Sequence, residues 1–192
     1  VGWGIWYGFD RLGQLRMGRF VDPSTLAAPA FSFDAADIVS FERVASTDEG
    51  KGVPPYKITV QYNKSYTVIT NLQTNTDSNT RAFMSKEWRS AVWTDTTIKD
   101  KYKTAPALSV NTVAQNNSDA VSEANRRGAL YGTRRDTLAV RVRSASAATS
   151  LELGRAVQIT YPRLGCDAGK LFVVIGLQVD YRTGTLDLTL WG

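Results

Sequence analysis

The chain has 192 residues, of which 43% are hydrophobic and 21% charged, and its 23 lysines and arginines against 18 acidic residues give a net charge of +5. A chain of this length forms one large domain or two small ones and removes roughly 70% of its unfolded surface from water. Its apolar runs are all too short to span a bilayer, so we expect no membrane-spanning segment. The positive charge is too modest to identify nucleic acid as a partner by itself.

The chain contains no histidine and a single cysteine, Cys166. These absences exclude Ser-His-Asp and Cys-His triads, histidine-ligated zinc, iron-sulfur clusters and an internal disulfide. Phosphate-binding glycine motifs and the nucleophile elbow are also missing. A carboxylate pair among Asp34, Asp37 and Glu42 stays open for glycoside hydrolysis, although a solvated loop and strand is the simpler interpretation. We therefore expect no enzyme, no cofactor and no metal.

Side-chain alternation predicts a hairpin at residues 3–17. Apolar side chains of both strands fall on one face, namely Trp3, Ile5, Tyr7, Phe9, Leu15 and Met17. Only a loop with an odd number of residues allows this, so we expect a three-residue loop at 11–13 with Gly13 in the left-handed conformation. A loop rich in Pro, Ala and Ser follows at 21–36, and a strand at 38–44.

The middle of the chain mixes strand and helix patterns. Residues 57–70 predict a further hairpin with its turn at 63–65. After the polar tract 71–80, Asp77 or Ser78 is expected to cap a short helix that runs to about Ala91, with Met84, Trp88 and Ala91 on its buried side. Residues 93–102 are expected to form an exposed strand or loop anchored by Ile98 and Tyr102, and Leu108 and Val110 alternate in the segment that follows.

The strongest helix pattern covers residues 119–130. Residues 116–118 supply the cap, acidic residues lie early, arginines lie late, and Gly132 ends the helix. We expect it to pack on a sheet through Val121, Ala124, Gly128 and Ala129. A strand at 137–143 then places Leu138, Val140 and Val142 inward and Arg141 and Arg143 outward, and 144–150 is expected to be a loop of small residues.

The last forty residues, 151–192, predict three strands separated by glycines. Odd positions from Leu171 to Tyr181 are apolar, and even positions take over in the last strand, at Leu186, Leu188 and Leu190. Only a loop with an even number of residues places both sets on one face. A two-residue loop at Thr183 and Gly184 satisfies this, and it would pair Tyr181 with Leu186 and Val179 with Leu188.

These elements predict a mainly β fold with one or two short inserted helices. Antiparallel strands with short turns favour one or two β-barrel-like domains, with a β-sandwich as the fallback. We expect either one compact unit over 1–192 or two intertwined barrel subdomains, about 1–70 with 105–192 and an insertion at about 71–104. Because the chain starts at valine, we interpret it as a fragment of a longer protein.

Two residue classes are candidates for binding. Seven arginines fall between residues 126 and 155, and they would meet phosphates unless they lie on the solvated side of a helix and a strand: Arg126, Arg127, Arg134, Arg135, Arg141, Arg143 and Arg155. Tryptophans are the other class, because rings such as Trp3, Trp6, Trp88 and Trp93 could form a sugar-stacking platform. A core or a subunit interface is the alternative location for these rings.

Residues 118–192 contain a set of short motifs that carry a family resemblance: Asp119-Ala120, Glu123-Ala124, Leu130-Tyr131-Gly132-Thr133-Arg134-Arg135, Leu153-Gly154, Tyr161-Pro162-Arg163-Leu164-Gly165, Ala168-Gly169-Lys170, Phe172-Val173-Val174-Ile175-Gly176 and Leu188-Thr189-Leu190-Trp191-Gly192. With them, this segment resembles the C-terminal end of a family of phage and prophage tail proteins related to tail-tip or baseplate-hub components. Residues 62–68 are similar to a tyrosine-asparagine hairpin upstream in the same family.

The resemblance implies non-catalytic β-barrel domains of hub type, which pack around the tail channel, often as a trimer. Other tail proteins and further copies of the chain would be the partners, DNA only a transiting cargo, and the location the virion tail, assembled in the bacterial cytoplasm. The aromatic hairpin and the arginine-rich segment then become a candidate assembly surface: Trp3, Trp6, Trp93, Arg134, Arg135, Arg141 and Arg143. A carbohydrate-binding β-module for host-surface recognition is the alternative.

Overall fold

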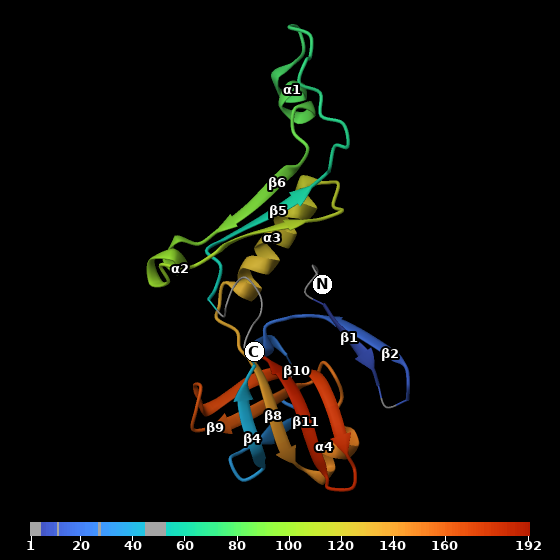
Figure 1. Cartoon of the computed structure of the whole chain (residues 1–192), viewed down its shortest axis with the longest axis vertical. Helices are drawn as coiled ribbons and strands as arrows, with labels where there is room; N and C mark the ends of the chain where they lie inside the picture. Colours follow the sequence, from blue (N-terminus) through green and yellow to red (C-terminus); the bar gives the residue numbers. More distant parts are fainter. Residues whose placement is uncertain (1–4, 11, 27, 45–52) are drawn as a thin grey trace. The chain divides into compact units, whose positions relative to one another are not determined.

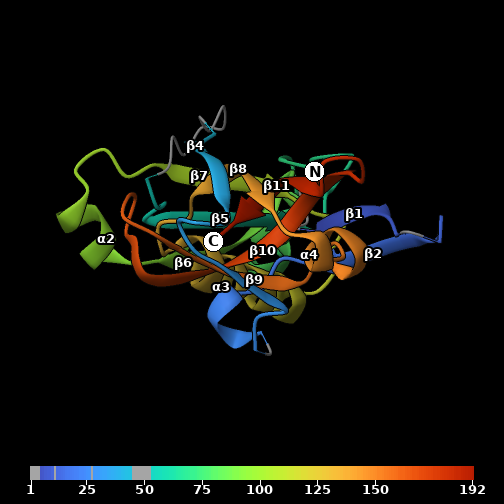
Figure 2. The ribbon, with the colours of Figure 1, turned by 90° about the horizontal axis from the view of Figure 1, so that it is seen from below.

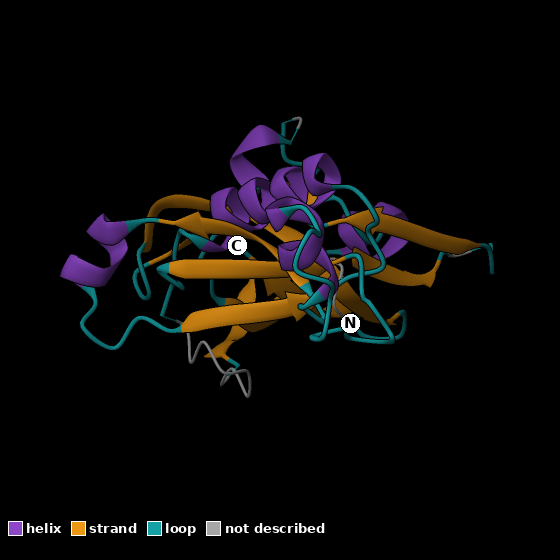
Figure 3. Cartoon of the chain, turned by 90° about the horizontal axis from the view of Figure 1, so that it is seen from above, coloured by secondary structure: helices purple, strands orange, loops and turns teal. Residues whose placement is uncertain are grey.

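A computed structural model of the chain describes residues 5–10, 12–26, 28–44 and 53–192. The protein is mainly β, with 40% strand and 21% helix, as expected (Figures 1 and 3). The chain is divided into two compact units. Unit 1 consists of the described residues of 1–52 together with 135–192, and unit 2 of residues 53–134. In the sequence, unit 2 is inserted between two strands of unit 1.

Unit 1 contains a six-stranded sheet that curls into a half-barrel. Its strand order is β3-β9-β10-β11-β8-β4, and all neighbours are antiparallel except β3 and β9. These strands are β3 (Phe31–Phe33), β4 (Ile38–Arg43), β8 (Thr137–Arg143), β9 (Ala156–Tyr161), β10 (Cys166–Asp180) and β11 (Thr185–Trp191). The barrel-like architecture expected from the hairpin pattern is therefore confirmed.

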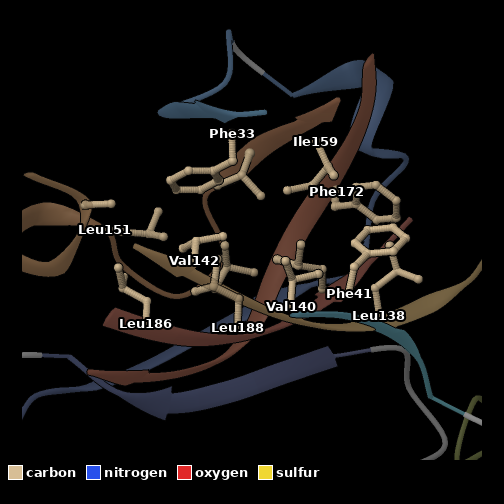
Figure 4. Close-up of a cluster of buried hydrophobic side chains, with 14 of the residues drawn as sticks. Phe33, Phe41, Leu138, Val140, Val142, Leu151, Ile159, Phe172, Leu186 and Leu188 are labelled. Atoms are coloured by element: carbon tan, nitrogen blue, oxygen red, sulfur yellow. The ribbon is translucent and has the colours of Figure 1, made fainter. Parts of the chain in front are cut away.

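The core of unit 1 fills the inside of this half-barrel (Figure 4). Leu138, Val140 and Val142 of β8 point inward as predicted and lie opposite Leu190, Leu188 and Leu186 of β11. The arginines of β8 point outward between them. Each fully buried Leu or Val side chain contributes roughly 1.5–3 kcal/mol, so these facing rows provide much of the driving force for folding of the unit.

The predicted face of β10 is wrong over the first half of the strand. A β-bulge lies between Val174 and Gly176, where Val174 pairs with Leu190 and Gly176 with Thr189. The extra residue, Ile175, reverses the alternation. Phe172 and Val174 therefore belong to the core before the bulge, and Leu177 and Val179 pack against it afterwards.

The turn between β10 and β11 has four residues, 181–184, instead of the predicted two. Val179, not Tyr181, pairs with Leu186. The prediction of an even loop length was correct, but the predicted pairing of the two strands was wrong by two residues. The side chain of Asp180 stabilises the longer turn. Its carboxylate accepts hydrogen bonds from the backbone N–H of Arg182 (2.9 Å) and from the Thr183 hydroxyl (2.8 Å). Gly184, with a φ of +63°, closes this larger loop.

The remaining segments of unit 1 agree in part with the sequence. The predicted loop 21–36 contains a 3-10 turn, η1 (Pro23–Thr25), and the short strand β3, whereas the strand predicted at 38–44 is confirmed as β4. Residues 144–150 were expected to be a loop but contain the helix α4 (Ala145–Ser150). The Ser144 side chain caps this helix, and the helix buries Ala147 and Ala148.

Unit 2 packs one helix on a three-stranded sheet of order β6-β5-β7. The strands are β5 (Lys57–Tyr62), β6 (Arg89–Thr94) and β7 (Ala107–Asn111), and the helix is α3 (Asn117–Tyr131), which Figure 2 shows beside them. The core consists of Ile58, Val60, Ala91, Ala120 and Ala124. The predicted helix is thus confirmed, but it packs through Ala120, Ala124 and Gly128, while Val121 and Ala129 are exposed.

Three predictions in unit 2 are wrong. The expected hairpin at 57–70 does not form, because β5 pairs with β6 antiparallel and with β7 parallel. The helix α1 (Ser78–Met84) starts at the predicted Asp77 cap but ends early, none of its residues is buried, and Ala91 lies in β6. Residues 93–102, expected to be an exposed strand or loop, instead form the end of β6 and the helix α2 (Thr96–Lys101), although Ile98 is buried as the predicted anchor.

Candidate assembly surfaces

The N-terminal hairpin forms a two-stranded sheet of its own, with β1 (Ile5–Phe9) paired to β2 (Leu15–Arg19). The pairing of Phe9 with Leu15 and the hydrogen bond from Asp10 N–H to the Gln14 carbonyl (2.9 Å) confirm the predicted three-residue loop. Gly13 has the expected positive φ of +74°. Within the described residues, both outer edges of this small sheet are unpaired.

One face of the hairpin is anchored to the rest of unit 1 through close contacts at glycines. The Trp6 ring lies over Gly18 and Gly154, where a Cβ atom would overlap the ring. A Cβ atom on Gly8 would likewise overlap the side chain of Leu153. Residues 153 and 154 lie just before β9, so these close contacts fix the root of the hairpin at the start of that strand.

The opposite face of the hairpin is exposed and apolar. We call it the hairpin face, and it consists of Tyr7 (66% exposed), Phe9 (71%), Leu15 (54%) and Met17 (66%). Tyr7 pairs with Met17 and Phe9 with Leu15, so the four side chains are neighbours. At the tip, Leu12 is 81% exposed. Apolar patches of this kind on a soluble protein usually mark an interaction site.

The tip of the hairpin is held by Asp10. Its carboxylate accepts hydrogen bonds from the backbone N–H of Leu12 (2.9 Å) and of Gln14 (2.8 Å), and it pairs with Arg16 (2.9 Å). The backbone bond from Gln14 and these other donors lower the pKa of Asp10. These bonds fix the described residues of the tip, and a fixed segment loses less entropy in any association than a flexible one.

The predicted tryptophans occupy separate places. Trp3 lies outside the described residues, whereas Trp6 of unit 1 and Trp93 of unit 2 are both half-buried. Trp93 lies against α3, where a Cβ atom on Gly128 would overlap its ring. One side of each of these two rings therefore packs within its own unit. Contact of the other side with a partner stays a prediction.

The predicted arginines are distributed over both units. Arg141 and Arg143 share the outer face of β8, and Arg141 forms a bidentate pair with Asp187 of β11 (2.6 and 2.8 Å), which raises the pKa of the guanidinium. Arg134, at the end of unit 2, is exposed. Arg135 lies over the Trp191 ring, 5.5 Å from its centroid, and pairs with Asp22 at 2.5 Å.

The Asp22–Arg135 pair predicts a loss of stability in acid. The hydrogen bond from Arg135 lowers the pKa of Asp22 to about 2, from an ordinary value of 3.8. The contribution is therefore complete above pH 3.8 and disappears as the pH falls through about 2. Because 37% of the Asp22 side chain is exposed, we expect only about 1 kcal/mol after solvent screening. Denaturant unfolding of Asp22→Asn between pH 2 and 5 should lack this part of the pH dependence, and an unchanged profile would contradict the assignment.

An arm projects from the end of β5 and β6 in unit 2 and spans residues 63–88 (Figure 1). Arg89 fastens its base by donating hydrogen bonds to the Asn63 carbonyl (2.6 Å), the Ser65 hydroxyl (2.6 Å) and the Phe83 carbonyl (2.5 Å). Its guanidinium also stacks on Phe83, 3.4 Å from the ring centroid. These contacts fix the base of the arm, although none of the residues of its helix α1 is buried.

Two open depressions lie on unit 1. The first, of about 490 Å³, surrounds the Arg141–Asp187 pair on the outer face of the sheet. The second, of about 370 Å³, is lined by Asp34, Ala35, Ala36, Thr160, Tyr161, Pro162 and Asp167. We call it the acidic depression, because two carboxylates and no cation line it.

The described residues were searched for metal sites, reactive thiols and membrane-spanning helices. They contain no group of three or more His, Cys, Asp or Glu side chains placed to hold a metal ion. Cys166 is buried, and burial raises the pKa of its thiol, which keeps it protonated and unreactive at neutral pH. Over the same residues, no helix has the length and apolar character needed to cross a membrane.

No protein-family model and no curated protein matches the sequence. Solved structures do match its fold. A tail protein from Neisseria meningitidis MC58 is similar over 98% of this chain, with a TM-score of 0.58 and 15% identity. The 43 kDa tail protein of prophage MuSo2 from Shewanella oneidensis is similar over 97%, with a TM-score of 0.51 and 10% identity.

A third match comes from the virion of a gene transfer agent particle, over 90% of this chain, with a TM-score of 0.50 and 12% identity. This chain spans 51%, 50% and 33% of the lengths of the three proteins, in the order given. At these identities the likeness establishes a shared fold, which includes both units of the chain.

Proposed function

We propose that this protein is a virion structural protein of a phage or prophage tail and acts by packing against its neighbours. Two of the fold matches are named tail proteins and the third belongs to a virion, and each covers at least 90% of this chain. The single observation that carries the mode of action is the hairpin face, which exposes four large apolar side chains on a preorganised hairpin. An exposed apolar surface of this kind usually marks a site where a partner binds.

The more specific proposal is a tail-tip or baseplate-hub component. In this role the protein packs around the tail channel without catalysis, contacts other tail proteins and further copies of itself, with a trimer as the expected state, and lets DNA pass as cargo. The half-barrel is suited to this role because its core is closed within one chain, which leaves its surfaces available for neighbours. The absence of histidine from the sequence agrees with a structural role.

The arginine-rich segment is proposed as a secondary part of the assembly surface. At least four of its seven arginines form ion pairs within the chain: Arg126 and Arg127 with Glu123, Arg135 with Asp22, and Arg141 with Asp187. Pairing reduces the positive charge that a phosphate backbone would meet. This segment therefore supports protein contacts better than sequence-independent binding of nucleic acid.

The aromatic side chains give the carbohydrate-binding alternative little support. Trp6, Trp93 and Trp191 each pack against their own unit. In the arm, the ammonium of Lys64 lies 5.3 Å from the ring centroids of both Tyr66 and Trp88, so both rings already have a cationic neighbour within the chain. None of the described tryptophans is exposed, since Trp6, Trp88 and Trp93 are half-buried and Trp191 is buried, so these residues form no open indole platform for a sugar.

A double substitution on the hairpin face tests the proposed function. In Tyr7→Ser with Met17→Ser, the loss of two exposed apolar anchors is expected to raise the dissociation constant for self-association at least tenfold. Analytical ultracentrifugation over a range of protein concentrations measures this constant. Stability should change little, because both side chains are exposed.

The matched control is Val92→Ser with Val113→Ser, which removes two apolar side chains that are 49% and 79% exposed in unit 2. It should associate like the unchanged chain. Equal weakening by both double variants would mean that the hairpin face has no special role, and a chain that is monomeric at every concentration would remove the self-association from the proposal.

A further inference from the structure

The net positive charge of the chain lies in unit 2. Residues 53–134 contain eleven lysines and arginines and six acidic residues, a net charge of +5, whereas the rest of the chain contains twelve of each and is neutral. Such a charge asymmetry between two parts of a chain is typical of a protein whose basic part meets a polyanion.

One face of the sheet of unit 2 is open to solvent. Ile58, Val60 and Ala91 point toward α3 and form the core, so the alternate side chains of β5, β6 and β7 point to the opposite side, where they are exposed or half-buried. We call this side the open face. None of its nine side chains is acidic, and six carry a hydroxyl or amide group: Thr59, Gln61, Ser90, Thr94, Ser109 and Asn111.

Lysines gather at one end of the open face. Lys57 begins β5, belongs to the open face and pairs with Thr94, the last residue of β6. A hydrogen bond from the Asp95 N–H to the Tyr56 carbonyl (2.8 Å) brings the start of α2 to the same end of the sheet (Figure 1). Three exposed lysines follow on α2 and just after it. We call the four together the lysine end: Lys57, Lys99, Lys101 and Lys103.

The charges of the lysine end are positioned but not neutralised. The ammonium groups of Lys99 and Lys101 lie 4.7 and 5.4 Å from the ring centroids of Tyr56 and Tyr102. A ring attracts a cation without cancelling its charge. Lys103 lies 3.9 Å from the Asp100 carboxylate, but both side chains are 81% exposed, so this pair is weak.

The composition of these surfaces fits a phosphate backbone better than a protein surface. The cores of protein–protein interfaces are enriched in aromatic side chains, methionine and arginine, and depleted in lysine and serine. The open face has Val92 as its one apolar side chain larger than alanine, and it has no arginine. Lysine, serine, threonine, asparagine and glutamine are the side chains that contact phosphates. The six residues of β6 span about 20 Å, which matches roughly six base pairs of a duplex.

We infer that the open face and the lysine end of unit 2 bind the phosphate backbone of duplex DNA. The lysines provide an attraction that does not depend on base sequence, and the hydroxyl and amide groups donate hydrogen bonds to phosphate oxygens. This inference rests on the proposed function, in which DNA passes as cargo, and it names the surface that contacts the DNA. None of the residues concerned belongs to the arginine-rich segment.

A charge-removing variant tests the lysine end. Fluorescence anisotropy with a labelled duplex of about 20 base pairs measures the affinity between about 50 and 200 mM salt. The triple variant Lys99→Gln, Lys101→Gln and Lys103→Gln is expected to raise the dissociation constant at least tenfold at the lower salt. It should also reduce the slope of log affinity against log salt by about 2–3, because each lysine displaces about one counterion.

The matched control removes the same charge from unit 1. Arg155→Gln, Arg163→Gln and Arg182→Gln replace three exposed arginines, and this variant should bind DNA like the unchanged chain. Binding that is absent at about 50 mM salt, or that is weakened equally by the two triple variants, would show that the lysine end is no DNA site.

A carboxylate placed on the sheet tests the open face separately. Ser109→Glu adds a negative charge in the middle of β7, where residue 109 is exposed, and should raise the dissociation constant about threefold or more because it repels phosphates. Val121→Glu is the control, since residue 121 is exposed on α3, the helix that covers the other face. Equal affinities of these two variants would remove the open face from the inference.

Two further measurements distinguish the possible failures. If the chain ignores DNA but binds a polyglutamate peptide, and the lysine variant loses that binding, the surface receives an acidic protein and the inference is wrong. In ultracentrifugation, the lysine variant should associate like the unchanged chain, because its hairpin face is intact. Absence of DNA binding together with normal self-association therefore rejects this inference alone, whereas a monomeric chain that binds DNA at the lysine end rejects the self-association alone.

Discussion

Replacing Gly128 by leucine is expected to unfold the packing of unit 2 while unit 1 stays folded. Gly128 faces Trp93, and even a Cβ atom there would overlap the indole ring. The Leu side chain must therefore push α3 away from β6 or expel Trp93 from the sheet. Overpacking of this kind costs about 3 kcal/mol, a large part of the stability of a unit with a core as small as this one.

Hydrogen exchange measured by mass spectrometry checks this result, because it reports the two units separately. Amides of β5, β6 and α3 should lose most of their protection, whereas those of β8 to β11 should keep theirs. Ala129→Leu is the matched control, since residue 129 is the exposed neighbour on the same helix. It should change stability by less than about 0.5 kcal/mol.

A second substitution shows whether Gly128→Leu acts through a clash with the Trp93 ring or through a general effect of leucine on the helix α3. In Trp93→Ala with Gly128→Leu, the new side chain can occupy the space that the indole leaves, so part of the lost protection should return. If Gly128→Leu is as stable as Ala129→Leu, the close contact between α3 and the Trp93 ring is not a determinant of the fold of unit 2.

Sequence alternation predicted strand pairing well where a loop of a few residues joins the two strands. The β1–β2 hairpin follows from residues that are at most fourteen positions apart, and its loop length follows from parity alone. The 57–70 hairpin was wrong because the true neighbours of β5 are distant in sequence, at β6 and β7. Alternation shows that a segment is a strand, but it does not show which strand it pairs with.

In the β10–β11 hairpin, whose existence was predicted correctly, single residues made the predicted faces and strand pairing wrong. One extra residue at the bulge near Ile175 exchanged the two faces of β10, and the Asp180 carboxylate enlarged the following turn. Neither changes the hydrophobic pattern in a way that can be read without the paired strand. Bulges and side-chain turns depend on the register of the partner, which appears only when the sheet is assembled.

The candidate site shows the same limit. The tryptophans were chosen because large rings often mark interfaces, yet Trp6 and Trp93 are held against glycines that lie far away in sequence, Gly154 and Gly128. The exposed residues are the less conspicuous Tyr7, Phe9 and Met17. The alternation of the hairpin grouped these residues on one face, but only the contacts at Gly154 show that it is the other face that packs inward.

Replacing Gly154 by alanine is expected to release the N-terminal hairpin from unit 1. Gly154 has a φ of +77°, where an L-residue is strained, and a Cβ atom there would overlap the Trp6 ring. Strain of about 1–2 kcal/mol adds to a steric term of similar size, so we expect a loss of about 3 kcal/mol in hairpin docking. Limited proteolysis followed by mass spectrometry should show new cleavage within residues 5–26.

Gly13→Ala is the control that isolates the steric term. Gly13 has almost the same φ, +74°, but nothing lies within 4 Å of its Cβ position. It should cost only the strain, about 1 kcal/mol, and leave the hairpin protected. Because the hairpin face is held in place only when the Trp6 contact is intact, Gly154→Ala should also weaken the proposed self-association, whereas Gly13→Ala should do so less. Equal cleavage in the two variants would show that the Trp6 contact does not hold the hairpin, and the preorganised surface that the assembly proposal needs would then be lost.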